Sequence, residues 1–280
     1  MPVVGPEKGS LVIMGGGGKD RQLRAVFEEF VKLAGGKKAK IVMVPTAASS
    51  NPKFTYQRSA TLLLAEAMGI EARVLHTHDR KVADSEEFVK PLMEATGVWF
   101  GGGRQWRLAK AYGGTRTEKE FHRVLERGGV IGGSSAGAAI QGSFLARGDT
   151  RANTIMVGNV QKGFGFLRNT AIDLHLIARG REKDLLKVLE DPRKRMRKAF
   201  DRAEMLGIGI DEDVAIVVKG DQFEVIGKDK GQVLVYDPKS WTKDTPDEKK
   251  WVRVRKGQKY DLKARNITSS RPSQTKLPNE

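Results

Sequence analysis

Short apolar runs alternate with amphipathic stretches along the first half of the chain. Apolar runs that end at Gly or Pro predict buried strands, whereas apolar residues spaced three and four apart predict helices. The expected strands are residues 11–14, 41–44, 72–75, 97–100 and a run that starts at Val130, and the expected helices span 23–34, 59–68, 85–95 and 118–127. This alternation predicts an α/β fold, a mostly parallel sheet flanked by helices.

The pattern changes after residue 140. Residues 154–159 and 170–176 predict short strands or loop edges, and residues 183–205 predict a long basic helix that Pro192 interrupts or kinks. Segments 208–219, 222–227 and 232–236 alternate around turn residues, which predicts C-terminal antiparallel hairpins, and 251–254 predicts a further strand. We expect one domain over residues 1–264, followed by a disordered basic tail over 265–280.

Composition narrows the possible chemistry. The 280 residues include no cysteine, which excludes disulfides, cysteine metal sites and a thiol nucleophile. No signal peptide or membrane-length apolar run is apparent, so we expect a cytoplasmic protein that does not bind membranes. The net charge of +16 raises the question of nucleic-acid binding, but the basic residues of 187–202 and of the region after Trp241 carry no nucleic-acid motif. A solvated basic face and tail that attract an acidic polymer are favoured instead.

The stretch from Val130 to Ile140 carries the strongest chemical signal. It reads VIGGSSAGAAI, in which Gly133 and Gly137 bracket Ser135 in a G-x-S-x-G pattern. Such a nucleophile elbow needs a strand, a sharp turn and a helix, and the order of residue types here predicts all three. An ordinary Gly/Ser-rich turn of an α/β domain is the competing interpretation.

Two other glycine-rich turns follow expected strands, at residues 15–20 and 101–106. Both fail the G-x-G-x-x-G and P-loop patterns, so neither predicts a nucleotide site. Turns at the carboxyl ends of parallel strands lie where open α/β sheets place their active sites. They therefore indicate either tight packing or backbone N–H groups that line a site.

A serine nucleophile requires a base and an acid. Of the four histidines, His122 falls in an expected surface helix, and His76 with His78 suggests a metal pair that no further ligand cluster supports. His175, which follows Ser135 in the chain, shares one face of an extended segment with Asp173. Acid candidates are the run of residues 211–213, for which solvated turn acids are an equal alternative, and, less favoured, Asp149.

Six segments together resemble peptidase family S51. They are the first strand with its glycine run, residues 44–49, 100–105, 132–138, 173–181 and 207–215, and they follow the family's order across residues 9 to about 264. The resemblance implies a fold like the class I glutamine amidotransferases (flavodoxin-like), with serine in place of their cysteine. It implies a serine exopeptidase that hydrolyses β-aspartyl bonds, as in cyanophycin, a poly-aspartate backbone with arginine on each side-chain carboxyl, to release β-Asp-Arg dipeptides.

The resemblance also implies residue roles. Ser135 matches the nucleophile, His175 the base and Glu212 the orienting carboxylate, although Asp211 is an alternative for the last. Backbone N–H groups of Gly103 and Ala136 would form the oxyanion hole. The matching pocket positions are Gln105, Asp173, Arg179 and Arg181, of which the arginines suit carboxylates and Asp173 suits a guanidinium. No metal or cofactor is implied, and a homodimer is suggested.

Four positions depart from the family pattern. Leu174 stands in place of a glutamine, Leu176 of an aromatic, Arg104 of an acid and Asp184 of an arginine. These changes leave the three proposed catalytic residues intact but alter the pocket. The alternatives are therefore an aspartyl or isoaspartyl dipeptidase acting on short acidic peptides, or a catalytically silent protein that binds acidic polymers.

Overall fold

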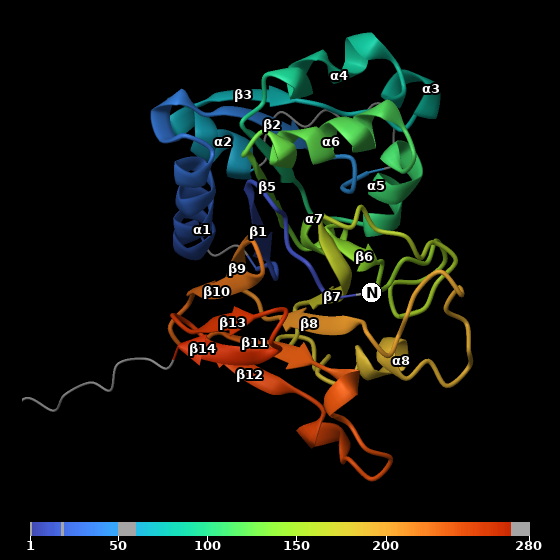
Figure 1. The fold of residues 1–280 in the computed structure, drawn as a ribbon. Helices are drawn as coiled ribbons and strands as arrows, with labels where there is room; N and C mark the ends of the chain where they lie inside the picture. Colours follow the sequence, from blue (N-terminus) through green and yellow to red (C-terminus); the bar gives the residue numbers. More distant parts are fainter. Residues whose placement is uncertain (1, 18–19, 50–59, 270–280) are drawn as a thin grey trace, which may run out of the picture.

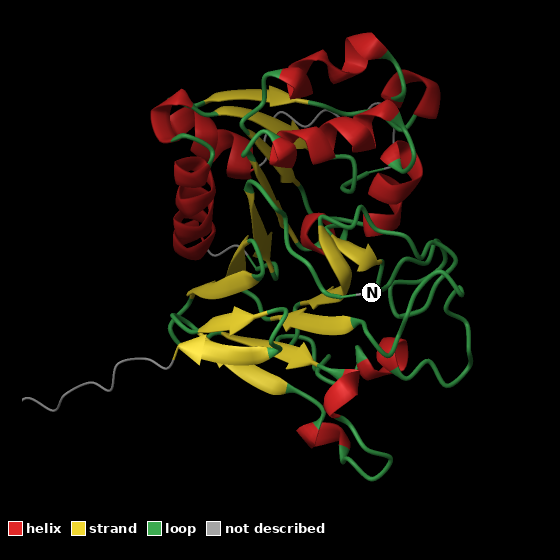
Figure 2. Cartoon of the chain, in the orientation of Figure 1, coloured by secondary structure: helices red, strands yellow, loops and turns green. Residues whose placement is uncertain are grey.

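The computed structural model describes residues 2–17, 20–49 and 60–269, which form two sheets with helices packed around the first (Figures 1 and 2). Within these residues the larger sheet has nine strands in the order β14-β13-β10-β9-β1-β5-β4-β2-β3. Its parallel half comprises β1 (Ser10–Met14), β2 (Lys40–Val44), β3 (Glu71–Val74), β4 (Gly97–Phe100) and β5 (Val130–Ser134). The five strands expected from the apolar runs are therefore present and adjacent.

An antiparallel half continues this sheet from β1. It comprises β9 (Val214–Lys219), β10 (Gln222–Gly227), β13 (Lys259–Asp261) and β14 (Asn266–Ser269). The predicted fold class, a mostly parallel core flanked by helices with C-terminal antiparallel hairpins, is confirmed.

Helices cover both faces of the parallel half. On one face lie α1 (Asp20–Leu33) and α2 (Ala60–Ala67); on the other lie α3 (Arg80–Ala83), α4 (Glu86–Met93), α5 (Gln105–Tyr112) and α6 (Arg116–Glu126). Phe27 and Phe30 of α1 pack edge-on against Trp99 of β4, with ring centroids 5.3 and 5.1 Å apart. These buried aromatic contacts hold α1 against the sheet.

The remaining strands form a second sheet. Its strand order is β12-β11-β8-β7-β6, formed by β6 (Gly142–Phe144), β7 (Leu167–Leu174), β8 (Leu206–Ile210), β11 (Gln232–Tyr236) and β12 (Val252–Arg255). The expected continuous strand over 208–219 is wrong, because the chain leaves β8 at residue 211 and enters β9 of the other sheet at residue 214. The three acids 211–213 thus form a crossing between two sheets, and not part of one strand.

The predicted long helix over residues 183–205 is also wrong. Only α8 (Leu186–Leu189) and short turns form there. Asp191 and Lys194 adopt left-handed φ values of 35° and 50°, and the Asp191 carboxylate accepts a hydrogen bond from the Met196 N–H at 2.8 Å. Pro192 between them cannot continue a helix, so the side chain closes a turn instead.

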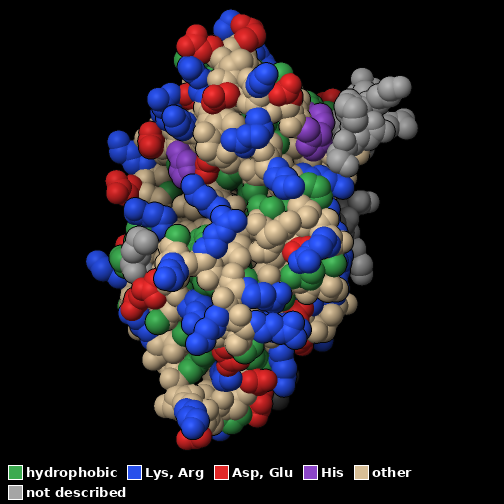
Figure 3. All heavy atoms as spheres, turned by 90° about the vertical axis from the view of Figure 1, so that its right-hand side faces the viewer, with side chains coloured by type: hydrophobic (Ala, Val, Ile, Leu, Met, Phe, Trp, Pro, Cys, Tyr) green, Lys and Arg blue, Asp and Glu red, His purple; other side chains and the backbone are tan. Residues whose placement is uncertain are grey.

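These turns and the loop over residues 145–163 lie at the right of Figure 1, which is the face turned to the viewer in Figure 3. Lys and Arg side chains are spread over much of that face. Residues 154–159, expected as a short strand or loop edge, belong to a loop. The basic residues of this region therefore lie on loops and not on a helix face.

The tail boundary needs a correction. Strand β14 pairs with β13 at residues 266–269, so ordered structure continues past residue 264 because these residues complete the edge of the larger sheet. Residues 270–280, the rest of the expected tail, lie outside the described residues. The expectation of one domain over 1–264 stays a prediction.

In the described part of the chain, no helix has both the length and the apolar character to cross a membrane. Short 3₁₀ turns are η1 (Gly36–Lys38), η2 (Pro238–Ser240) and η3 (Asp247–Lys249).

Candidate active site

Three successive carbonyl groups at the end of β1 hold the candidate catalytic loops together. The Met14 carbonyl accepts the N–H of Ser135 at 3.1 Å, the Gly15 carbonyl accepts that of His175 at 3.0 Å, and the Gly16 carbonyl accepts that of Asp213 at 2.9 Å. Each of these hydrogen bonds fixes the backbone of one loop, so three segments that are far apart in the sequence are held at the same strand end. The first glycine-rich turn is part of the site.

Ser135 occupies a strained strand-to-helix turn. It has φ 54° and ψ −119°, and it lies between β5 and the short helix α7 (Ala136–Ala139). A Cβ atom at Gly137 would lie 2.1 Å from the carbonyl oxygen of Phe100, so only glycine allows this close crossing. The geometry is that of the expected nucleophile elbow.

The three side chains expected to cooperate form a continuous hydrogen-bonded chain. Oγ of Ser135 lies 2.8 Å from Nε2 of His175, and Nδ1 of His175 lies 2.6 Å from Oε1 of Glu212. An ionised carboxylate only accepts hydrogen bonds, so the proton of a neutral imidazole belongs on Nδ1. Nε2 is then free to accept the hydroxyl proton of Ser135.

His175 is held where its neutral form is favoured. Its φ is 59°, its residue is 9 % exposed, and β7 ends immediately before it. Burial lowers the pKa of His175 below its ordinary value of 6.5; the hydrogen bond to Glu212 opposes this shift, and the charge of Arg179 adds to it. A base that is neutral near pH 7 can accept a proton.

The other acids considered from the sequence have different partners. Oδ1 of Asp211 accepts the N–H groups of Ile177 and Glu212, and its Oδ2 pairs with Lys228 at 3.0 Å. Asp149 is buried and binds Arg151 through both carboxylate oxygens, an interaction that lowers the pKa of Asp149. Glu212 is therefore the acid that contacts the imidazole, and Asp211 braces the loop that carries it.

A cavity of about 270 Å³ opens beside Ser135. Gly103 and Ala136, the two expected oxyanion donors, both line it, and so do all four expected pocket residues: Gln105, Asp173, Arg179 and Arg181. Gly103 has φ 137°, which places its backbone against residues 47 and 48. The structure thus brings together every site residue expected from the sequence.

The cavity also holds a buried ion cluster that sequence reasoning missed. Arg147 is 4 % exposed and binds Asp173 through two bonds, Nε–Oδ1 at 2.8 Å and Nη2–Oδ2 at 3.0 Å; it also bonds to Asp184. Burial favours neutral Arg147, but the bonds to both carboxylates raise the pKa of Arg147 above its usual value. Both oxygens of Asp173 are already occupied, so Asp173 does not face the cavity as an unpaired carboxylate. No pattern in the sequence joins residues 147, 173 and 184.

The remaining pocket groups differ in how firmly they are fixed. Gln105 is buried and its amide donates to the Ala146 carbonyl at 2.7 Å, and Arg181 donates to the Leu174 carbonyl at 3.1 Å. The side chain of Arg179 is 47 % exposed, and its Nε lies 4.0 Å from Oε1 of Glu212. Arg179 therefore has the freedom to contact an incoming group.

The four residues that depart from the family pattern lie in different surroundings. Leu174 lines the cavity, whereas Leu176 packs in a buried cluster with Leu185. Arg104 donates to the Asp149 carbonyl at 2.9 Å, and Asp184 bonds to the buried Arg147. Leu174 and the Asp184 cluster are thus the changes that bear on the cavity.

The other histidines lie elsewhere. His76 forms a hydrogen bond with Thr46 at 2.9 Å. His122 forms one with the Phe164 carbonyl at 3.0 Å and is half-buried, although a surface position was expected. His78 lies 2.6 Å from the Ser49 carbonyl. Over residues 2–17, 20–49 and 60–269, no three His, Asp or Glu side chains are grouped as metal ligands would be.

The site combines a hydroxyl, an imidazole and a carboxylate, hydrogen-bonded in that order at the strand ends of an α/β fold. This arrangement defines a class of protein, the hydrolases with a triad-type site. Comparisons with known proteins narrow this class. The family model of peptidase family S51 matches residues 11–226, and the chain belongs to this family. It is a peptidase.

Relatives with assigned activities and solved structures agree with this placement. The chain is 28% identical over 235 residues to a cyanophycinase of Geminocystis herdmanii, covering 82% of this chain and 81% of that protein. It is 30% identical over 241 residues to a cyanophycinase of Nostoc sp., covering 84% and 76%. The fold is similar to that of a peptidase from an acI-B1 actinobacterium, with a TM-score of 0.67, 22% identity, and 92% and 98% of the two chains covered.

Proposed function

We propose that this protein is a serine-type exopeptidase that releases β-Asp-Arg dipeptides from cyanophycin. Because the β-aspartyl bond to arginine survives in that product, the bond cleaved is the backbone peptide bond between successive aspartates. The observation that carries the proposal is the hydrogen-bonded chain from Ser135 through His175 to Glu212, with separations of 2.8 and 2.6 Å. The relatives named above as cyanophycinases support the substrate.

In the proposed reaction Nε2 of His175 takes the hydroxyl proton as Oγ of Ser135 forms a bond to the carbonyl carbon of the scissile backbone peptide bond. The C–N bond then breaks, and the imidazolium returns the proton to the departing amine. Water, deprotonated by the same imidazole, then attacks the acyl carbon. The bond from that carbon to Oγ breaks, Oγ recovers its proton from the imidazolium, and the acid product leaves. Glu212 holds the imidazole in the required tautomer and stabilises the imidazolium.

Backbone N–H groups of Gly103 and Ala136 are the proposed oxyanion donors. Both residues line the cavity beside the hydroxyl. The N–H of Ser135 itself is occupied by the Met14 carbonyl, which leaves the following N–H, at the start of α7, for the oxyanion. Preorganised donors of this kind are typically worth 10²–10³ in kcat for each one removed.

Arg179 and Arg181 supply the charge for binding a substrate carboxylate, and Gln105 lines the same cavity. The occupied state of Asp173 favours a second candidate function. Because Arg147 binds both carboxylate oxygens and neutralises their charge, Asp173 attracts a substrate guanidinium less than an unpaired carboxylate would. This observation favours a dipeptidase acting on short aspartyl or isoaspartyl peptides without arginine.

Mass spectrometry of the products from purified cyanophycin and from isoaspartyl dipeptides tests both candidates. Release of β-Asp-Arg supports the exopeptidase, whereas cleavage of the dipeptides alone supports the second candidate. Ser135→Ala should lower turnover of the cleaved substrate at least about 10⁴-fold, since the nucleophile is lost. Ser134→Ala, a change of the preceding serine, is the matched control and should retain activity. Full turnover by Ser135→Ala would refute the assignment of the nucleophile.

A further inference from the structure

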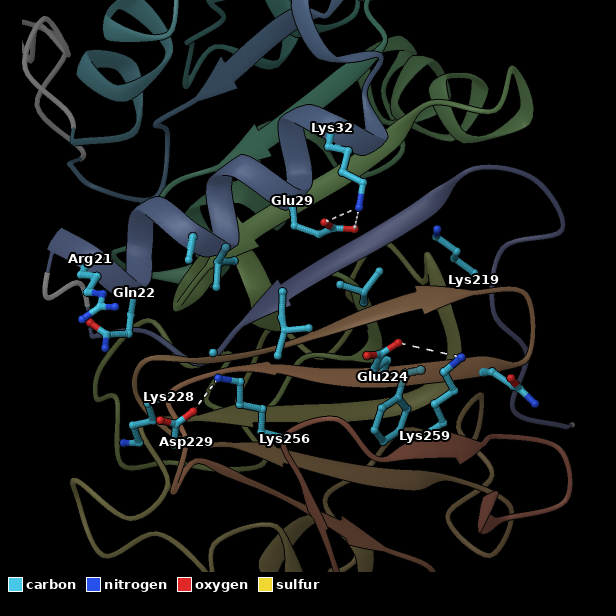
Figure 4. A pocket seen from close by; sticks show the side chains of 17 residues that line it. Arg21, Gln22, Glu29, Lys32, Lys219, Glu224, Lys228, Asp229, Lys256 and Lys259 are labelled. Atoms are coloured by element: carbon cyan, nitrogen blue, oxygen red, sulfur yellow. Dashed lines mark hydrogen bonds and ion pairs between the residues drawn. The ribbon is translucent and has the colours of Figure 1, made fainter. Parts of the chain in front are cut away.

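A large hollow lies away from the catalytic cavity. It is a groove of about 820 Å³ between α1 and the antiparallel strands β9, β10 and β13 (Figure 4). This volume is about three times that of the cavity beside Ser135. Helix α1 rises about 16 Å from Arg21 to Lys32 along the groove, enough for about five residues of an extended chain.

The charge of this groove is predominantly positive. Its lining includes six cations and three carboxylates: Arg21, Lys32, Lys219, Lys228, Lys256 and Lys259 against Glu29, Glu224 and Asp229. Each carboxylate already has a lysine of the same groove beside it, at 3.1 Å for Glu29, 2.6 Å for Asp229 and 3.9 Å for Glu224. The excess charge is therefore cationic, and Arg21 and Lys219 are both exposed.

One end of the groove meets the loops of the active site. Figure 4 shows Arg21, Gln22, Lys228 and Asp229 gathered at one end, and Lys32, Lys219 and Lys259 at the other. At the first end, Nζ of Lys228 pairs with Asp211, and its backbone N–H donates to the carbonyl of Asp213. These two acids flank Glu212 in the chain, so the groove and the catalytic loop share a wall.

We propose that this groove is a second binding site for an extended polypeptide that carries a carboxylate on every repeat. The identity of that polymer as the substrate rests on the proposed function, since each repeat of cyanophycin presents an arginine α-carboxylate together with a guanidinium, and the groove lining carries both cations and carboxylates. A chain held along α1 keeps its remaining length beside the enzyme while its end is cleaved, which raises the local concentration of cleavable ends.

The residue types that line the groove favour a polypeptide over a nucleic acid as the ligand. Exposed apolar and aromatic surfaces for base stacking are expected in single-strand binders, and the one aromatic residue in this lining, Phe223, is buried. The cations are also interspersed with carboxylates, which would repel a continuous phosphate backbone.

Binding of fluorescent poly-L-aspartate at low salt tests the groove directly. The measurement uses full-length Ser135→Ala protein, in which no turnover occurs. Adding Arg21→Glu and Lys219→Glu should weaken binding about tenfold, because two exposed attractions become repulsions. The double change Arg193→Glu with Lys198→Glu, on the exposed basic loop, alters the net charge equally and should change binding less than about twofold. Equal losses in both double variants, or none in the groove variant, would overturn the proposal.

Two further measurements separate the groove from the proposed function. In protein with Ser135 intact, the groove variant should lower kcat/KM for the polymer several-fold and leave kcat/KM for a two-repeat fragment unchanged; equal losses on both substrates would contradict a separate site. If the parent cleaves neither substrate, the proposed function fails while the poly-L-aspartate measurement still decides the groove. Tighter binding of duplex DNA than of poly-L-aspartate, lost in the same variant, would replace the polypeptide by a nucleic acid.

Discussion

The catalytic cavity and the basic groove both contain ion pairs between basic and acidic side chains, but the pair in the cavity is buried and the pair in the groove is exposed. In the cavity, the Arg147 and Asp173 side chains are 5% and 3% exposed, and each satisfies the other. In the groove, the Lys256 and Asp229 side chains are 39% and 88% exposed. Buried pairs fix geometry because a lost partner leaves an uncompensated charge, whereas exposed pairs contribute little and remain available for exchange. The cavity is thus built for positioning, and the groove for attraction.

The largest effect should come from breaking one pair of each kind. Arg147→Met leaves Asp173 and Asp184 without their buried partner and should lower the free energy of unfolding by about 3–5 kcal/mol. Lys256→Met, the matched change in the groove, should lower it by less than about 1 kcal/mol. Urea unfolding followed by circular dichroism measures both. Similar losses in the two variants would remove the contrast between the regions.

A smaller effect should follow from a methyl group placed against the imidazole. At Gly16, which has φ 105°, a Cβ would lie 2.2 Å from Cε1 of His175. Gly16→Ala should therefore displace the ring and lower kcat/KM by about 10²-fold, the typical cost of a 1 Å misplacement.

Gly69→Ala controls for backbone strain alone. Gly69 also has a left-handed φ, 65°, but a Cβ there would meet no atom within 4 Å. Its kcat/KM should stay near that of the parent in the same steady-state assay. Activity of Gly16→Ala equal to that of Gly69→Ala would show that the ring does not need its present position.

The smallest effect should be a shift in the pH profile. The positive charge of Arg179 lowers the pKa of His175, so Arg179→Met should raise that pKa. The base acts when neutral, and activity therefore falls as the pH drops through this pKa; the acid limb of kcat/KM should move to higher pH in the variant. Lys219→Met in the groove should leave the limb in place. A limb that moves to lower pH, or moves equally in both variants, would contradict the electrostatic role of Arg179.

Local patterns along the chain were sufficient to predict much of the fold. Apolar runs closed by Gly or Pro predicted β1, β2, β4 and β5, because a buried strand needs a continuous apolar run and a breaker after it. Strand β3 is a mostly exposed edge strand, and His76 rather than Gly or Pro follows the run that predicted it. The same logic failed where a local signal competed with tertiary structure. Basic residues 183–205 read as a helix, yet Pro192 and the Asp191 side chain close turns there.

For the site, the sequence alone determined which residue types are present and which of them can cooperate: an elbow serine, one histidine after it and a group of acids. Their convergence depends on three carbonyls, that of the last residue of β1 and those of the two glycines after it. Hydrogen bonds between distant segments produce no periodic pattern in a sequence. The partner of Asp173, the choice of Glu212 over Asp211, and the groove along α1 were decided only by the tertiary structure. Each depends on which side chains meet across elements far apart in the chain, and that is set by the packing of the whole chain.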